Sequence, residues 1–526
     1  MHLRLPKTRR YRIYLYLLST LIILTALDLL IARLLRHITL APDTTHITTP
    51  LLPNGTPDYL TAINAQLSAG VTPDNNAAIP LITLLGPQLF ADPAVANDTC
   101  AALQLPPPVE SPHPFIIFER WYEQHHPDAH DQFPDLDNPA TNITFHPWQP
   151  ADHPDAAAWL HDANPAIDAF DQLTRRTRYY IPLIVTNPDH ILIETHIPNT
   201  APIRGLANAA LIRATRRIAS HDLDGAWQDL LAVHRISRLL SNGSATLIEQ
   251  LVAAALETSA ATADVALAQS PDLTPDQARR CIADLRALTP LSPMARTLNT
   301  TERYSLLNFT CTAAARGTPW AMRYMQAITD NSFPPGSKWY CVFIPIAYNH
   351  ALRSINAFYD QLTAAASAPK FSDSVALQSA LNNHINALAQ RNILTRFTTG
   401  DVFSIWLFPS VNRALERERA ALQRTDIAQL AFALAAYHAD HHAYPDSLQP
   451  LLFAYLPTIP NDRFADAPLQ YHATADTYVV YSIGPNLKDD AGRDRASSKQ
   501  TPPPDDIAIS LPPLTPPTAS QPTTVR

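Results

Sequence analysis

Two segments in the middle of the chain give the clearest indication of the fold: LANAALIRATRRIAS (206–220) and GAWQDLLAVHRISRLL (225–240), which are joined by HDLD (221–224). In the second segment, apolar residues recur every three or four positions, which is the spacing of a helix that buries one face. These residues are Ala226, Leu230, Val233, Ile236 and Leu240. The HDLD linker can cap the second helix. The two segments therefore predict a helical hairpin that resembles one tetratricopeptide-type unit, and no second copy follows at a 34-residue period.

Helical patterns continue through residues 156–410, which we expect to form an α-helical body. The segment AAAWLHDANPAIDAFDQLTRR (156–176) is expected to form two helices with a turn at Pro165 between them. Further helices are predicted over 244–270, 274–288, 347–367 and 374–398, with Thr274 as an N-cap. The chain is thus expected to be mainly α. His234, in the hairpin, is interpreted as a satisfied or half-buried histidine rather than a base.

A small α+β module is predicted over residues 411–510. Its long helix spans Arg417–Asp440 and ends before the Tyr-Pro corner at Pro445. Three short segments of β-prone residues follow and predict an antiparallel three-stranded sheet against this helix. The predicted strands are Leu469–His472, Tyr478–Ser482 and Ile507–Ser510. Residues 511–526 are rich in Pro and Thr and are expected to be disordered.

The order of sequence motifs in this module is similar to that of a known protein family. The segments are AFALAAYHADHHAYPDSLQPL, PNDRFADAPLQYH, YVVYSIGPNLKDDAG and DDI, within 417–510. They resemble the globular domain of the type II secretion pseudopilin G, in which a long helix leads through a Tyr-Pro corner to a small sheet with an acidic loop. The processed N-terminus of pseudopilins has no counterpart near Tyr11, so we do not expect this chain to be processed by prepilin peptidase or to polymerise as a pilus.

The plan of the whole chain resembles a group of uncharacterised, membrane-anchored bacterial proteins. The segments that carry this second resemblance are AWLHDANPAIDAF (158–170), TERYSLLNF (301–309) and ALRSINAFYDQL (351–362). The resemblance implies an envelope protein, and it implies no activity.

The likeness to pseudopilin G implies a calcium ion in the acidic loop before the last strand. Ca²⁺ binds six to eight oxygen ligands, which carboxylates and carbonyls of such a loop supply. The matching residues are Asp489 or Asp490 in the loop and Asp505 or Asp506 before Ile507, with Asp494 as an additional candidate ligand. The alternative is a solvated acidic loop held by local turns.

The N-terminal 37 residues predict a membrane anchor. The segment from Tyr11 to Ala32 is largely apolar, and about 22 residues span roughly 33 Å as a helix, enough for a bilayer core. Basic residues crowd its N-terminal side, at Arg4, Lys7, Arg9, Arg10 and Arg12. After Arg33 and Arg36 no Lys or Arg occurs until Arg120, so the positive-inside rule places the N-terminus in the cytoplasm. We expect an uncleaved single-pass anchor in the bacterial inner membrane with the bulk of the chain outside the cytoplasm; the alternative is a cleaved signal peptide.

Residues 38–155 are rich in Pro, His and Asp and are expected to be loosely structured, with short helices such as one over 57–69. His126 and His130 are four residues apart, but Pro127 disfavours the helix that would bring them together on a metal. A metal-assisted hydrolase is nevertheless the enzymatic alternative for this region. Its candidate residues are His125, His130, His153, Asp155 and His161.

Composition excludes several classes of function. Only 11 glycines occur in 526 residues, and none has the spacing of a P-loop or a dinucleotide-binding turn. The formal net charge of −8 disfavours a nucleic-acid partner. We therefore expect a membrane-anchored protein of structural or interaction type, with envelope or pilin-like proteins as partners and no evident catalysis. A further alternative is an accessory component that docks to a secretion or pilus system.

Overall fold

The computed structural model describes residues 34–111, 114–128, 142–186, 191–328, 345–406, 411–493 and 503–512, together with a few positions between 16 and 23. It is mainly helical and ends in a small three-stranded antiparallel sheet, as the sequence predicts. The helices of the N-terminal half are α2 (Tyr59–Leu67), α3 (Ala78–Leu85), α4 (Pro93–Ala102), α5 (Phe118–His125), α6 (Pro154–Thr174), α7 (Ala201–Ala219), α8 (Leu223–Gly243) and α9 (Leu247–Ala268). Those of the C-terminal half are α10 (Pro275–Ala287), α11 (Met294–Thr297), α12 (Arg303–Arg316), α13 (Thr318–Ile328), α14 (Tyr348–Ser367), α15 (Phe371–Gln390), α16 (Ile393–Thr399), α17 (Asp401–Trp406) and α18 (Asn412–His441).

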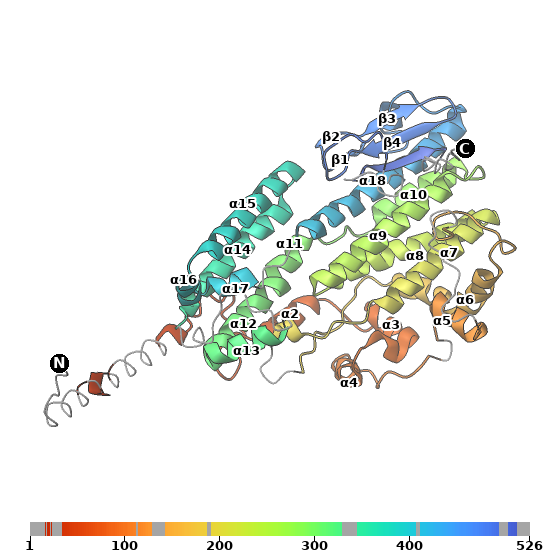
Figure 1. Cartoon of the computed structure of the whole chain (residues 1–526). Helices are drawn as coiled ribbons and strands as arrows, with labels where there is room; N and C mark the ends of the chain where they lie inside the picture. The colour runs from red at the N-terminus through yellow and green to blue at the C-terminus, as the bar shows by residue number, and fades with distance from the viewer. Residues whose placement is uncertain are drawn as a thin grey trace, which may run out of the picture.

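Four long helices, α7, α8, α9 and α18, lie side by side and form the centre of the body (Figure 1). Side-chain hydrogen bonds cap the starts of α8, α9 and α10. The carboxylate of Asp222 accepts from the amide of Gly225 at the start of α8, and Thr246 and Thr274 form capping boxes at the starts of α9 and α10. The predicted helical hairpin and the predicted Thr274 cap are thus confirmed. A second unit, in which α14 pairs with α15 and packs against α12, has its own apolar core.

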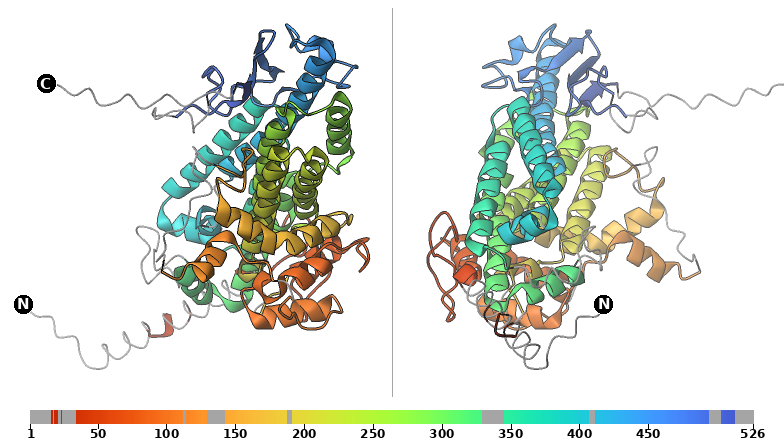
Figure 2. Two further views of the ribbon diagram at one scale, coloured as in Figure 1. Left: turned by 90° about the vertical axis from the view of Figure 1, so that its right-hand side faces the viewer. Right: turned by 60° about the vertical axis from the view of Figure 1, so that its left-hand side comes forward.

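The sheet lies at one end of the molecule, beyond α10, and packs on the C-terminal half of α18 (Figures 1 and 2). Strands β3 (Gln470–Ala473), β4 (Tyr478–Ser482) and β5 (Ile507–Leu511) are antiparallel in the order β3-β4-β5. Tyr471 pairs with Val480, which in turn pairs with Ile509. A two-residue pair, β1 (Asn461–Asp462) and β2 (Ala467–Pro468), precedes it.

The C-terminal segment and the helical body share one hydrophobic core. Leu430 and Leu434 of α18 belong to the same buried cluster as Leu230 and Val233 of α8. Between Ile427 and Ala436, almost every side chain of α18 is buried, so this helix is covered on all sides. One side faces the sheet, and the others face α9 and α10. The predicted helix is confirmed, but it serves the body as well as the sheet.

Helix α6 is one continuous helix of 21 residues, and the predicted turn at Pro165 was wrong. Proline removes one intrahelical hydrogen bond, but Pro165 and His161, the residue four positions before it, both lie at the exposed face. The carbonyl of His161 can therefore bind water. A buried apolar stripe that includes Trp159, Ala163 and Phe170 continues past the proline and holds the helix together. The predicted helix over 374–398 instead divides, because α15 ends at Gln390 and Asn392 caps α16.

Residues 38–155 are better packed than their composition predicts. In the described part of this region, Tyr59 and Ile63 of α2 and Leu81 of α3 are almost fully buried. Helices α3 and α5 pack against α6. The expectation of a loose region was wrong here because a few apolar residues between the prolines suffice to attach each short helix to the body.

The predicted membrane span, Tyr11–Ala32, lies outside the described residues except for a few isolated positions. Among the residues that the structure describes, one helix, α9, is long and apolar enough to cross a membrane by length and composition. Over half of its apolar window, 56%, is buried inside the protein, and it packs between α8 and α18. A buried core helix accounts for this signal.

Candidate functional site

The antiparallel pairing of β4 with β5 brings the predicted acidic residues together. Ser482 pairs with Ile507, so the loop that follows β4 and the residues that precede β5 meet at one edge of the sheet. Gly484 makes this approach feasible. Its φ is +69°, and a Cβ atom there would lie 2.3 Å from the carbonyl oxygen of Asp505.

Three of the five predicted residues form a group. Carboxylate oxygens of Asp490, Asp505 and Asp506 lie within 4.8 Å of one another. In the described part of the chain, this is the only set of three or more His, Cys, Asp or Glu side chains gathered closely enough to hold a metal ion. The carboxylate of Asp489 instead accepts from the hydroxyl of Tyr481 at 3.0 Å, and Asp494 lies outside the described residues.

The surroundings of the Asp506 carboxylate indicate that these three aspartates could bind a cation. It is 1% exposed, and its Oδ2 accepts from the amides of Asp490 and Gly492 at 3.1 and 2.8 Å. Its Oδ1 has no hydrogen-bond partner among the described residues. Burial, together with the negative charge of Asp490, raises the pKa of Asp506 to about 6. An oxygen-binding divalent ion would satisfy the free oxygen and reduce the repulsion between the carboxylates.

Among the residues that the structure describes, the histidines of the hydrolase alternative are not gathered into a metal site. His125 stacks on Trp121, with ring centroids 4.1 Å apart, and the Nε2 atom of His126 lies 3.2 Å from Asp155. His153 packs edge-on against Trp148, and His161 is exposed on α6. His130 lies outside the described residues. Nothing in this arrangement supports a hydrolytic centre.

A fully buried ionic network lies between α8, α9 and α18. The Nδ1 atom of His234 lies 3.1 Å from Glu257, and its Nε2 lies 2.9 Å from Asp264. The Nη2 atom of Arg238 donates to Glu257 at 2.8 Å, and the hydroxyl of Thr425 donates to the same carboxylate at 2.7 Å. Burial disfavours the charged imidazole, but the two carboxylates outweigh it and raise the pKa of His234 to about 9.

The prediction that His234 is a satisfied histidine is therefore confirmed. Its partners were not predicted, although the sequence contains a signal for them. Glu257 and Asp264 are seven residues apart in an Ala-rich helix and so lie on one face of it. Acidic residues on the buried face of such a helix require a cationic partner.

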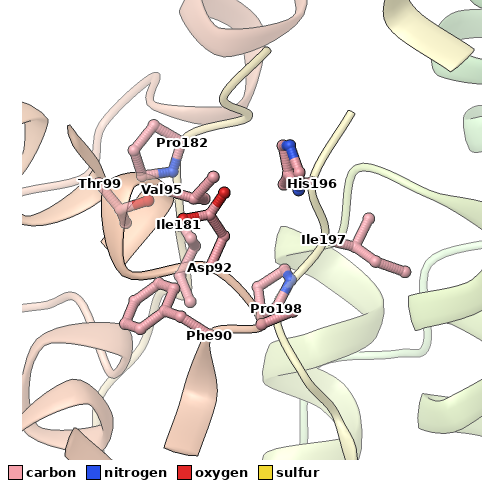
Figure 3. A pocket seen from close by; sticks show the side chains of 10 residues that line it. Phe90, Asp92, Val95, Thr99, Ile181, Pro182, His196, Ile197 and Pro198 are labelled. Carbon is pink, nitrogen blue, oxygen red and sulfur yellow. The ribbon is translucent and has the colours of Figure 1, made fainter. Parts of the chain in front are cut away.

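A small cavity lies where α4 meets the extended segments around Ile181 and Ile197. In Figure 3, Asp92, Thr99 and His196 surround it together with apolar side chains. Its volume is about 20 Å³, which is space for a water molecule but not for an organic ligand. Asp92 also has a structural role, since its carboxylate accepts from the amide of Ala94 at the start of α4. This cavity is therefore not a candidate site.

Comparison with known proteins yields no match, whether with family models, with curated proteins or with solved structures.

Proposed function

We propose that the protein is a single-pass, N-in protein of a bacterial inner membrane, and that its helical body holds a cation-binding loop away from the membrane as a binding surface for envelope or pilin-like partners. The observation that carries the proposal is the placement of the acidic loop at the end of the body opposite to the segment that follows the predicted anchor. The role is structural or interactive, because no catalytic group accompanies the loop within the described residues.

Contacts of the segment after the predicted anchor support this orientation. The amide of Thr39 donates to the side chain of Asn349 at 2.9 Å, and the same side chain donates to the carbonyl of His37 at 2.7 Å. These contacts join the chain to the first turn of α14, near α13 and α16 (Figure 1). The sheet lies at the other end, where Gln269 donates to the carbonyl of Ser510 at 2.9 Å. Helix α18 alone has 30 residues, a length of about 45 Å.

Reporter fusions test the topology. Alkaline phosphatase fused after residue 526 is expected to be active in cells, whereas a fluorescent protein that matures only in the cytoplasm is expected to stay dark at the same position. Replacing Arg4, Lys7, Arg9 and Arg10 by serine should reduce the phosphatase activity, because it removes the charge asymmetry that orients the span. A bright C-terminal fluorescent fusion with inactive phosphatase would contradict the proposal.

Calcium is expected to stabilise the full chain through the acidic loop. At about ten times its Kd, an ion that binds only the folded state adds about 1.4 kcal/mol to the free energy of unfolding. The measurement is the thermal midpoint with and without CaCl₂, and Asp506→Asn and Asp490→Asn should each abolish the increase. Asp476→Asn, at an exposed position outside the group, should leave it unchanged. An equal response of wild type and Asp506→Asn would contradict calcium binding at this loop.

A further inference from the structure

Six arginines line a cavity on the side of the body, remote in sequence from the acidic loop. The cavity measures about 600 Å³, within the range of small-molecule sites. It is enclosed by the ends of α2, α6 and α8 and by the chain from the end of α10 to α11. The arginines are Arg175, Arg176, Arg178, Arg235, Arg238 and Arg296. No acidic side chain is among the residues that line it.

Only half of these arginines are paired with carboxylates. Arg175 binds Asp171 at 2.7 Å, Arg235 lies 3.8 Å from the same aspartate, and Arg238 binds Glu257. Six guanidinium groups therefore line the cavity with only two carboxylates in contact with them, Asp171 and Glu257, and Glu257 also faces His234, so positive charge is in excess around the cavity. Asp284, whose charge also acts on Arg235, accepts from the indole of Trp227 and is not part of the lining.

The other three arginines have no carboxylate partner within the described residues. Arg176 donates to the carbonyl oxygens of Pro73 and Asp74, at 2.6 and 2.8 Å. Arg296 donates to those of Asn242 and Ser241, at 2.9 and 3.0 Å. Such contacts fix the guanidinium groups in place and leave their charge uncompensated. Burial lowers the pKa of Arg296, in keeping with a cation that lacks a counter-ion.

Arg238 is the most deeply buried of the arginines that line the cavity. It is 8% exposed, and its Nε has no hydrogen-bond partner among the described residues. The Nε atom is itself inaccessible to solvent, so it faces packed protein and not the open cavity. Arg238 lines the cavity, and Glu257 holds its guanidinium group in place, so it contributes a fixed positive charge to the wall.

We propose that this cavity, the arginine pocket, binds a small organic molecule that carries several oxyanion groups. Guanidinium groups bind phosphate and carboxylate through paired hydrogen bonds, so both chemistries fit. Leu67, Val71, Leu239 and Leu288 supply an apolar part of the wall, which favours an organic ligand over a simple inorganic ion. The net charge of the chain, −8, makes this a local cationic site on an acidic protein and not part of a generally basic surface.

Calorimetry on the purified full chain in detergent tests the proposal, with sodium triphosphate and sodium citrate as probes at about 0.15 M ionic strength. We expect saturable binding of one molecule per chain. Arg178→Gln with Arg235→Gln should weaken it roughly 10- to 100-fold, because hydrogen bonds to charged groups contribute that much to affinity. Tighter binding of triphosphate identifies a phosphate ligand, and tighter binding of citrate a carboxylate ligand.

The control carries the same change in charge outside the pocket. Arg120→Gln with Arg204→Gln alters two exposed arginines that do not line the cavity, and binding should change less than about twofold. The single variant Arg178→Glu, at an exposed position, provides the same test if the double pocket variant does not fold. The proposal is overturned if neither probe binds at about 10 mM, or if pocket and control variants weaken binding equally.

Discussion

Replacing Glu257 by alanine is expected to lower the free energy of unfolding by about 3–5 kcal/mol, because Arg238 loses its counter-ion and His234 loses one of its two. The carboxylate is inaccessible to solvent and receives hydrogen bonds from Arg238, His234 and Thr425, which belong to α8 and α18. Removing it leaves Arg238 without a carboxylate partner and leaves Asp264 as the remaining carboxylate beside His234. The measurement is chemical denaturation of the full chain, followed by circular dichroism.

A pH series distinguishes this cause from the loss of side-chain volume, and a control variant shows the effect of the same substitution at an exposed site. Glu123→Ala removes an exposed glutamate on α5 and should change stability by less than about 0.5 kcal/mol. Because the folded-state pKa of His234 is about 9 and its ordinary value is about 6.5, the stabilisation by its charge is complete below the ordinary pKa. It is lost as the pH rises through about 9. This loss should be clear in the wild type and smaller in Glu257→Ala; identical pH profiles would contradict the assignment.

Replacing Phe432 by alanine is expected to destabilise the helical body as well as the C-terminal sheet, by about 3–5 kcal/mol. Phe432 of α18 is fully buried, and its ring meets that of Trp227 on α8 edge-on, with centroids 5.6 Å apart. All seven tryptophans precede residue 411, so tryptophan fluorescence follows the unfolding of the body, and Trp227 also reports on its contact with α18. The fluorescence transition in denaturant should shift to a lower midpoint in Phe432→Ala.

Phe453→Ala is the matched control for this experiment. Phe453 lies in the same C-terminal segment but is 84% exposed, so its removal deletes little buried surface. Its fluorescence midpoint should equal that of the wild type. If Phe432→Ala also left the tryptophan transition unchanged while the sheet melted, the C-terminal segment would be an independent module, contrary to the shared core.

The sequence predicted local structure well wherever one principle governed it. Apolar spacing identified α7, α8 and α18, and β-prone residues located β4 at Tyr478–Ser482. Proline was misleading at Pro165, because the lost hydrogen bond and the clash with the preceding turn are outweighed by the buried apolar face of α6, which continues past the proline. The expectation that residues 38–155 are loosely structured was also wrong. The overall composition of this region conceals the few buried apolar residues, such as Tyr59, that attach each short helix to the body.

The two candidate sites also differ in whether the sequence could predict them. The acidic loop could be predicted because the ordered motifs of residues 417–510 resemble those of pseudopilin G, and this resemblance implies such a loop before the last strand. The arginine pocket could not, because Arg178, Arg235 and Arg296 come from three separate parts of the chain and meet only through the packing of α6, α8 and α11. No spacing rule connects residues so far apart, and their number is unremarkable among the 39 basic residues of the chain.

The central position of α18 also determines when the protein can finish folding. The contact between Thr425 and Glu257 joins residues 168 positions apart, and Arg238 and His234 meet that same glutamate. During synthesis or export, α8 and α9 are complete long before α18 emerges. Until then, the apolar and charged side chains that α18 covers in the folded protein are exposed to solvent. We therefore expect the nascent chain to be prone to aggregation over that interval, and truncation before residue 411 should yield an aggregating product.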